Sequence, residues 1–201
     1  MRIIAGRAGG TRLTAPSGRD VRPTSDRVKE AVFASLGDIQ ELAVADLFSG
    51  TGALGLEALS RGAATVFLVE RSERHIRCIR ENVKRVRKCL GEEACAHVDV
   101  RIVRGDVAVT PSLLAAERGR FDLLFADPPY HPSEREMGPV QFVSDAAIAA
   151  WAGDALLVLE HSSDTALPWA PLSPWRLLKT RRFGTRQVSF ARCGEQVVSA
   201  T

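Results

Sequence analysis

The sequence predicts an α/β fold in which a mostly parallel sheet is covered by helices on both faces. From about residue 43 onward, short apolar segments of strand length alternate with longer amphipathic segments of helix length. Runs such as Leu123–Ala126 and Ala155–Leu159 are apolar throughout, as expected of strands that are buried on both faces. A glycine-rich turn joins the first strand-like segment to the first helix-like segment, an arrangement typical of nucleotide-binding α/β sheets.

The first 37 residues predict an extension ahead of this sheet. Residues 2–5 and 11–13, joined around Gly9-Gly10, predict a β-hairpin. After a proline- and glycine-containing loop, residues 24–26 offer N-cap side chains for a helix, and Gly37 is suited to end it. We therefore expect residues 1–37 to form a hairpin and a helix that precede the main domain.

Apolar runs of strand length alternate with segments that have helical periodicity, and this alternation predicts the remaining elements of a domain that spans residues 38–193. We expect strands at 44–48, 65–70, 98–103, 121–126, 155–160, 175–180 and 187–192, and helices at 54–61, 72–90, 111–117 and 140–150. The last two strands predict an antiparallel pair. The stretch 88–97 is longer than its junction requires, and residues 194–201 predict a frayed tail.

Size and composition restrict the class of protein. With 201 residues, 45% of them hydrophobic, the chain is large enough to bury a substantial core. No apolar run is long enough to span a bilayer, and the first residues lack the apolar stretch of a signal peptide, so we expect a cytoplasmic protein with no membrane contact. The four cysteines show no spacing typical of zinc ligands, so we expect no metal site.

Positive charge gathers toward the two ends of the chain. Residues 1–30 hold seven Lys and Arg against three acids, and residues 176–192 hold six against none. The net charge of the whole chain is +3, so the rest of the sequence is acidic. This distribution favours a polyanionic partner that meets both ends, the alternative being an ordinary solvated surface.

The glycine-rich turn predicts a site for an adenosine-containing cofactor. Asp46 to Gly55 contains a G-x-G-x-x-G pattern between a strand and a helix, and Glu70 ends the next strand, 24 positions after Asp46. A carboxylate at that place can accept hydrogen bonds from both hydroxyls of a ribose, and Asp106 after the third strand can accept from an adenine amino group. The spacing alone fits either a nicotinamide dinucleotide or S-adenosylmethionine.

The tetrapeptide Asp127-Pro128-Pro129-Tyr130 follows the fourth predicted strand. Two prolines fix φ and stiffen the loop, which then presents a carboxylate, a carbonyl and an aromatic ring together. The two oxygens suit the hydrogens of an exocyclic amino group, and the ring suits the face of its base. Holding both N–H bonds would aim the nitrogen lone pair at a methyl sulfonium, and the base would have to leave its stack to reach the loop.

With these motifs in hand, the chain resembles the RsmD-type family of bacterial 16S rRNA guanine-N2 methyltransferases over nearly its whole length. The resemblance is carried by Arg2-Ile3-Ile4-Ala5-Gly6, by Arg22 to Glu30, by Asp46 to Gly52, by Glu57 to Ala63 and by the tetrapeptide. It implies a class I methyltransferase sheet of seven strands, the last antiparallel, with an N-terminal hairpin. It further implies S-adenosylmethionine as cofactor and, as substrate, a guanine of 16S rRNA in the small ribosomal subunit or its assembly intermediate. We expect the enzyme to act as a monomer.

By position in these motifs we assign three sets of site residues. The base is expected to meet Asp127, Pro128, Pro129 and Tyr130. The cofactor is expected to contact Asp46, Phe48, Ser49, Gly50, Thr51, Gly52, Glu70, Arg71, Gly105, Asp106, Val107 and Asp127. The RNA is expected to contact Arg2, Arg7, Arg12, Arg22, Thr24 and Arg27.

Three other functions stay open from the residues alone. Adenine-N6 methylation of DNA or RNA suits the tetrapeptide equally well, and only the family resemblance separates it from guanine-N2 methylation. An NAD-dependent oxidoreductase would use the glycine loop and Glu70 but would leave the tetrapeptide idle. A non-catalytic RNA-binding factor would leave both motifs idle. Of the histidines, His131 is expected to face solvent and His161 to be structural.

Overall fold

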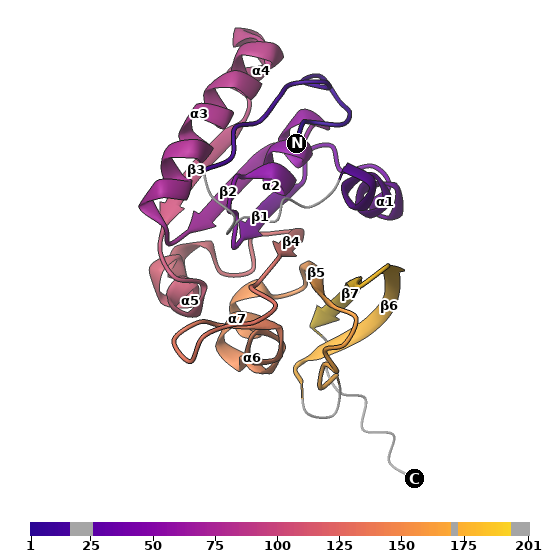
Figure 1. The fold of residues 1–201 in the computed structure, drawn as a ribbon. Coiled ribbons are helices and arrows are strands. Elements are labelled where there is room, and N and C mark those ends of the chain that lie inside the picture. Colours follow the sequence, from indigo (N-terminus) through magenta and orange to yellow (C-terminus); the bar gives the residue numbers. More distant parts are fainter. Residues whose placement is uncertain (17–25, 170–172, 194–201) are drawn as a thin grey trace. The chain divides into compact units, whose positions relative to one another are not determined.

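The computed structural model describes residues 1–16, 26–169 and 173–193 (Figure 1). The chain divides into two compact units, Met1–Val107 (unit 1) and Ala108–Thr201 (unit 2). Among the described residues, no helix combines the length and apolar character needed to cross a membrane.

Unit 1 contains three parallel strands in the order β3-β2-β1. They are β1 (Ala43–Leu47), β2 (Thr65–Glu70) and β3 (Asp99–Arg104). The register places Asp46 beside Leu68 and Glu70 beside Arg104. Because parallel strands end at the same edge, the residues that follow β1, β2 and β3 meet at one edge of the sheet.

Helices α2 (Ala53–Ser60) and α3 (Glu73–Leu90) pack on the strands of unit 1 (Figure 1). Every residue of α2 is buried, which explains its short and almost wholly apolar sequence. In α3, Ile76, Ile79, Val83 and Val86 form the buried stripe, and Ser72 caps the first turn. The extra length noted at 88–97 is a short helix, α4 (Glu92–Ala96).

The N-terminal segment pairs as predicted but forms no continuous strands. A single antiparallel bridge joins Arg2 to Arg12, and the amide of Ile3 donates to the carbonyl of Thr11 at 2.9 Å. Ile3 is fully buried, so this segment is anchored by its own apolar side chain as well as by backbone bonds. The predicted helix is confirmed as α1 (Asp26–Leu36), and Gly37 follows it with a positive φ of 77°.

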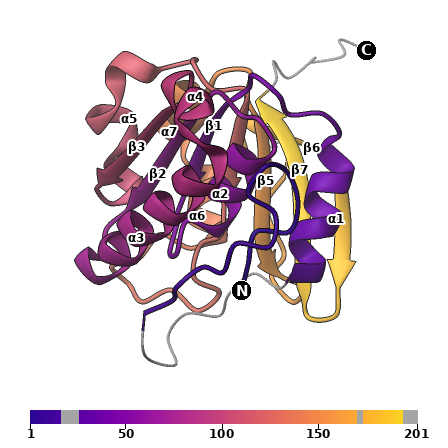
Figure 2. The same cartoon turned by 90° about the horizontal axis from the view of Figure 1, so that it is seen from above.

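Unit 2 contains four strands in the order β4-β5-β7-β6. They are β4 (Leu123–Ala126), β5 (Leu156–Ser162), β6 (Trp175–Phe183) and β7 (Arg186–Cys193). β4 and β5 are parallel, whereas β7 is antiparallel to both β5 and β6. Figure 2 shows β6 alongside β7, at the end of this series of strands.

The helices of unit 2 are shorter than the sequence predicts. The segment expected as one helix at 111–117 is a helical turn, α5 (Thr110–Leu113), followed by a 3-10 turn, η2 (Ala115–Glu117). The helix expected at 140–150 is two helices, α6 (Pro139–Ser144) and α7 (Ala146–Ala152). The break has a local cause, because the carboxylate of Asp145 accepts from the amides of Ala147 and Ile148 and so starts a new helix.

The seven strands predicted within residues 38–193 are all present, with some boundaries displaced. β4 begins at Leu123 rather than at residue 121, and β6 and β5 extend three and two residues beyond the predicted ends at 180 and 160. Phe121 nevertheless stays buried, since its ring lies 5.3 Å from that of Trp151. The predicted tail, 194–201, lies outside the described residues.

Candidate active site

The glycine-rich loop carries the chain from β1 into α2 through an unusual backbone. Phe48, Gly50 and Gly52 have positive φ values of 63°, 56° and 77°. For a bulky residue such as Phe48 this conformation costs of order 1–3 kcal/mol and persists only where the surroundings enforce it. A Cβ built on Gly50 would find no atom nearer than 3.9 Å, so this side of the loop is open to a ligand.

Asp46 holds the loop from within. It is 2% exposed, and its Oδ2 accepts a hydrogen bond from the amide of Gly55 at 2.9 Å. Burial raises the pKa of Asp46 from 3.8 to about 7, and the nearby Glu70 charge adds to the rise, while the Gly55 amide opposes it. A Cβ on Gly55 would lie 2.5 Å from Leu68 Cδ2, so the third glycine of the pattern serves helix–strand packing rather than ligand approach.

Glu70 ties the end of β2 to the loop. Its Oε2 accepts from the amide of Gly50 at 2.8 Å, and its Oε1 accepts from the amide of Ser72 at 2.7 Å. His75 Nδ1 lies 3.5 Å from Oε2. Each oxygen keeps a second lone pair, so the carboxylate can hold the loop and still accept from a pair of ligand hydroxyls.

Asn82 on α3 is a loop contact that sequence reasoning missed. It is fully buried, and its Nδ2 donates to the carbonyls of Thr51 and Thr14 at 3.0 and 2.9 Å. Its Oδ1 accepts from the amide of Thr14 at 2.8 Å. The signal was present in the sequence, because an asparagine at this spacing lies on the apolar stripe of α3 and must find polar partners there.

The end of β3 completes the edge of unit 1. The amide of Gly105 donates to the carbonyl of Glu70 at 3.1 Å, and Val107 is buried. The carboxylate of Asp106 lies 3.6 Å from Arg71 Nη1, and both side chains are substantially exposed. The structure therefore brings the unit 1 cofactor candidates to one edge, at the ends of β1, β2 and β3, with Asp46 inside β1 and Glu70 as the last residue of β2.

The base loop, Asp127 to Tyr130, follows β4 in unit 2 and has no regular secondary structure. Pro128 is buried, whereas Asp127, Pro129 and Tyr130 are half-buried. The Tyr130 hydroxyl donates to Glu160 Oε1 at 2.7 Å. Burial and this bond raise the pKa of Tyr130 far above its usual range, so the phenol stays protonated.

Glu160 and Arg186 are the other residues of this region that sequence reasoning missed. Arg186 Nη1 lies 2.9 Å from the same Glu160 Oε1 that accepts from Tyr130. The side chains of Glu160 and Arg186 are 5% and 19% exposed. An acid that closes an apolar parallel strand, as Glu70 also does, was the available signal for Glu160.

The two histidines singled out in the sequence lie outside the two loops. His131 is exposed, as expected, and His161 is buried, with Nε2 2.9 Å from the Ser189 hydroxyl. Burial lowers the pKa of His161, which agrees with a structural role. Within the described ranges, no group of three or more His, Cys, Asp or Glu is arranged to hold a metal ion.

The predicted RNA contacts divide into described and undescribed residues. Arg2, Arg7, Arg12 and Arg27 are exposed, whereas Arg22 and Thr24 lie outside the described residues. Arg7 Nη2 donates to the carbonyl of Leu90 at 3.4 Å, and Arg2 Nε lies 3.5 Å from the Asp26 carboxylate. These are weak surface contacts that an incoming phosphate could replace.

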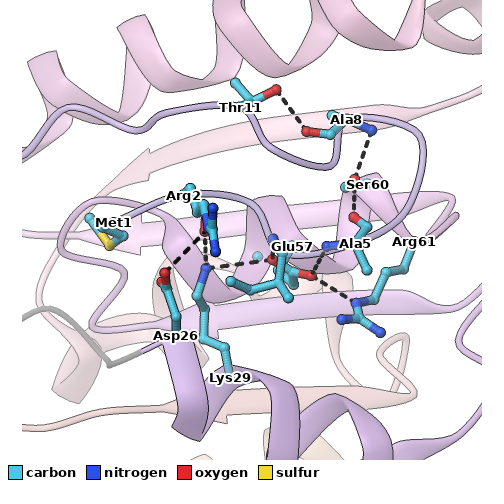
Figure 3. A network of polar contacts seen from close by, with 12 residues as sticks. Met1, Arg2, Ala5, Ala8, Thr11, Asp26, Lys29, Glu57, Ser60 and Arg61 are labelled. Carbon is cyan, nitrogen blue, oxygen red and sulfur yellow. Dashed lines mark hydrogen bonds and ion pairs between the residues drawn. The ribbon is translucent and has the colours of Figure 1, made fainter.

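Glu57 anchors the N-terminal segment to α2 (Figure 3). Its fully buried carboxylate accepts from the amides of Ile4 and Ala5 at 2.7 and 3.0 Å. It also pairs with Arg61 Nε at 2.9 Å and with the buried Lys29 Nζ at 3.5 Å. Lys29 in turn donates to the Arg2 carbonyl, so the segment that carries Arg2 is fixed to both α1 and α2.

Comparison with known proteins places this arrangement in a family. The family model described as Conserved hypothetical protein 95 matches residues 1–192. The Ribosomal RNA small subunit methyltransferase D of Escherichia coli K12 is 31% identical over 186 residues, covering 92% of this chain and 85% of that protein. Its namesake in Haemophilus influenzae is 32% identical over 188 residues, covering 92% and 89%.

Solved structures agree with these sequence matches. A hypothetical protein of Thermus thermophilus superposes with a TM-score of 0.73 at 28% identity, covering 96% of this chain and 99% of that one. An RNA methyltransferase of Salinibacter ruber, solved with S-adenosyl-L-homocysteine, has a TM-score of 0.58 at 17% identity and shows the shared fold. The predicted class I methyltransferase fold, with seven mostly parallel strands and helices, is confirmed.

Proposed function

Because the chain belongs to the RsmD-type family of ribosomal RNA small subunit methyltransferases, we propose that it transfers the methyl group of S-adenosylmethionine to the exocyclic N2 of a guanine in 16S rRNA. The observation that supports the reaction most directly is the base loop after β4, in a chain that also carries the open glycine loop and Glu70. Neither motif is idle under this proposal.

The residues of unit 1 fit an adenosine-containing sulfonium. Gly50 leaves one side of the loop open, and the Glu70 carboxylate has lone pairs available for two ribose hydroxyls. Asp106, which follows β3, would accept from an adenine amino group. When bound, S-adenosylmethionine supplies an activated methyl group, whose carbon forms a bond to N2 as its bond to sulfur breaks.

The base loop would prepare the amine for that transfer. The lone pair of an exocyclic amine is delocalised into the ring, so the free amine is a poor nucleophile. The Asp127 carboxylate and the Pro128 carbonyl would accept its two N–H bonds, and these bonds strengthen as positive charge develops on nitrogen. Asp127 or water then takes the proton that leaves N2, while the Tyr130 ring stacks on the base.

Exposed positive charge on each of the two units supports an RNA substrate. Arg2, Arg7 and Arg12 are exposed on the N-terminal segment, and along β6 all residues between Trp175 and Phe183 are exposed. β6 carries four of the six cations found between residues 176 and 192, a stretch without acids. We infer that the enzyme acts as a cytoplasmic monomer on the small ribosomal subunit or its assembly intermediate.

The test is methyl transfer from labelled S-adenosylmethionine to small subunits that lack the modification, with free 16S rRNA and plain DNA alongside. The product is digested to nucleosides and identified. We expect N2-methylguanosine from the subunit. N6-methyladenosine, or label confined to DNA, would keep the role of the base loop but overturn the substrate, and tight binding of NAD in calorimetry would overturn the reaction.

A further inference from the structure

We propose that Glu160 and Arg186 are positioning residues that hold the Tyr130 ring in the orientation needed to stack on the target base. The inference deepens the proposed function and rests on it, because it assumes that the base is bound at the loop after β4. It assigns a role to two residues that belong to neither motif.

The base loop needs such a support because of how its aromatic side chain is attached. Pro128 and Pro129 stiffen the backbone, but they leave the side-chain torsions of Tyr130 free. The ring is fixed at its other end by the hydrogen bond that the Tyr130 hydroxyl donates to Glu160 Oε1 at 2.7 Å. A ring held at both ends can meet a flipped base without first being ordered, which favours stacking.

Glu160 is itself well placed to act as a fixed point. It lies on β5, which is flanked by β4 and β7, and the register pairs it with Val188. Arg186, at the start of β7, donates to the same oxygen at 2.9 Å. The phenol and the guanidinium therefore converge on one atom of a carboxylate that is 5% exposed.

The chemistry of the pair favours positioning over simple stabilisation of the sheet. Taking a carboxylate out of water is unfavourable, and apolar residues of similar size often stabilise a buried position as well or better. A purely structural ion pair between β5 and β7 would also not require the Tyr130 hydroxyl. The shared oxygen instead links the ion pair directly to the base loop.

The decisive test is a double-mutant cycle between Tyr130 and Glu160, read as kcat/KM for methyl transfer to RNA. We expect Tyr130→Phe, which keeps the ring but removes the hydroxyl, to lower kcat/KM about tenfold. Glu160→Ala should lower it by at least as much, and the double variant should be no worse than the poorer single variant. Glu160→Gln, which keeps an acceptor for the hydroxyl, should recover most of the activity.

Two controls separate positioning from unfolding and from a general charge effect. The affinity for S-adenosylmethionine and the unfolding midpoint are measured on every variant, and Glu134→Gln removes an exposed carboxylate beyond the base loop. We expect unchanged cofactor affinity throughout and wild-type transfer in Glu134→Gln. Additive losses in the double variant, or equal activity in Tyr130→Phe and wild type, would overturn the proposal.

A second readout does not depend on activity. Tyr130 is the only tyrosine in the chain, so incorporation of ¹³C-labelled tyrosine gives ring signals from this residue alone. We expect wild type to show a shift distinct from free tyrosine, and Glu160→Ala to show narrower signals near the free value. Unchanged ring signals in a folded Glu160→Ala protein would overturn the positioning role, whereas a wild-type product other than N2-methylguanosine would overturn only the proposed function.

Discussion

The glycine-rich loop and the base loop, both rigid, are held by different means. In the glycine-rich loop, side chains from β1, β2 and α3 grip backbone groups, through Asp46 to Gly55, Glu70 to Gly50 and Asn82 to Thr51. In the base loop, two prolines stiffen the backbone, and the hydroxyl of Tyr130 is held by Glu160. The first arrangement fixes a surface for a cofactor, and the second fixes functional side chains.

This difference predicts that substitutions in the two loops affect cofactor binding and methyl transfer differently. Removing a side chain that grips the glycine-rich loop should weaken cofactor binding, and more cofactor should compensate. Removing a side chain of the base loop should impair transfer at any cofactor concentration.

The largest effect is expected for Asp127→Ala. If Asp127 accepts an N–H bond of the target amine, methyl transfer should fall by at least about 10³-fold, while cofactor affinity stays within a few-fold of wild type. Single-turnover transfer and calorimetry on the same preparation measure both. The matched control is Asp122→Ala, an exposed acid just before β4, which should behave as wild type. Loss of cofactor binding in Asp127→Ala would remove Asp127 from the proposed role.

Glu70→Ala should weaken cofactor binding rather than methyl transfer at saturating cofactor. Loss of two bonds to backbone amides, together with the proposed ribose contacts, should raise the Kd for S-adenosylmethionine by about 100-fold. The control is Glu73→Ala, the removal of a surface acid that pairs with Arg80 and Arg104. An unchanged Kd in Glu70→Ala would contradict the account of the glycine-rich loop.

The buried carboxyl of Asp46 should make the stability of the fold depend on pH. Because its pKa is raised from 3.8 unfolded to about 7 folded, ionised Asp46 destabilises the fold, and stability should fall as pH rises from about 4 to 7. Asp46→Asn removes this charge. Its free energy of unfolding should exceed that of wild type by a margin that grows across the window to roughly 4 kcal/mol or less. Denaturant titrations at pH 4.5 and 8 test this, and an equal difference at both values would refute it.

The smallest effect concerns the N-terminal segment. Arg7→Glu with Arg12→Glu should weaken RNA binding about tenfold at low salt and reduce the slope of log K against log salt by about 1–2. Cofactor affinity should not change. Arg118→Glu with Arg120→Glu alters the net charge equally in unit 2 and should leave the slope nearer to wild type. Equal effects of the two pairs would remove the segment from the RNA footprint.

The two loops also differ in how far the sequence predicts them. The glycine-rich loop is a local pattern, and its glycines, its closing acid and the flanking elements follow from glycine conformations and hydrophobic periodicity. The positive φ of Phe48 and the contact from Asn82 do not follow from that pattern. The base loop was predicted as a stiff presenter of Asp127 and Tyr130, but its support was not. Glu160 and Arg186 lie 30 and 56 positions beyond Tyr130, and no local pattern connects them.

Two other features of the structure were not predicted, and both depend on polar side chains. The split of the helix at 140–150 depends on one side chain, Asp145, that competes with the helical backbone for its amides. Lysine is rarely fully buried, yet Lys29 on α1 is buried against Glu57 and the Arg2 carbonyl. The Asp145 contact is a local N-cap, whereas the Lys29 contacts join residues 27 and 28 positions apart in the chain.

The division of labour between the two loops is tested most directly by raising the cofactor concentration. Single-turnover methyl transfer to small subunits is measured for Glu70→Ala and Asp127→Ala from low to saturating S-adenosylmethionine. We expect Glu70→Ala to recover most of the wild-type rate at saturation and Asp127→Ala to stay at background throughout. Recovery of Asp127→Ala, or failure of Glu70→Ala to recover although its site is filled, would show that cofactor binding and methyl transfer are not divided between the two loops.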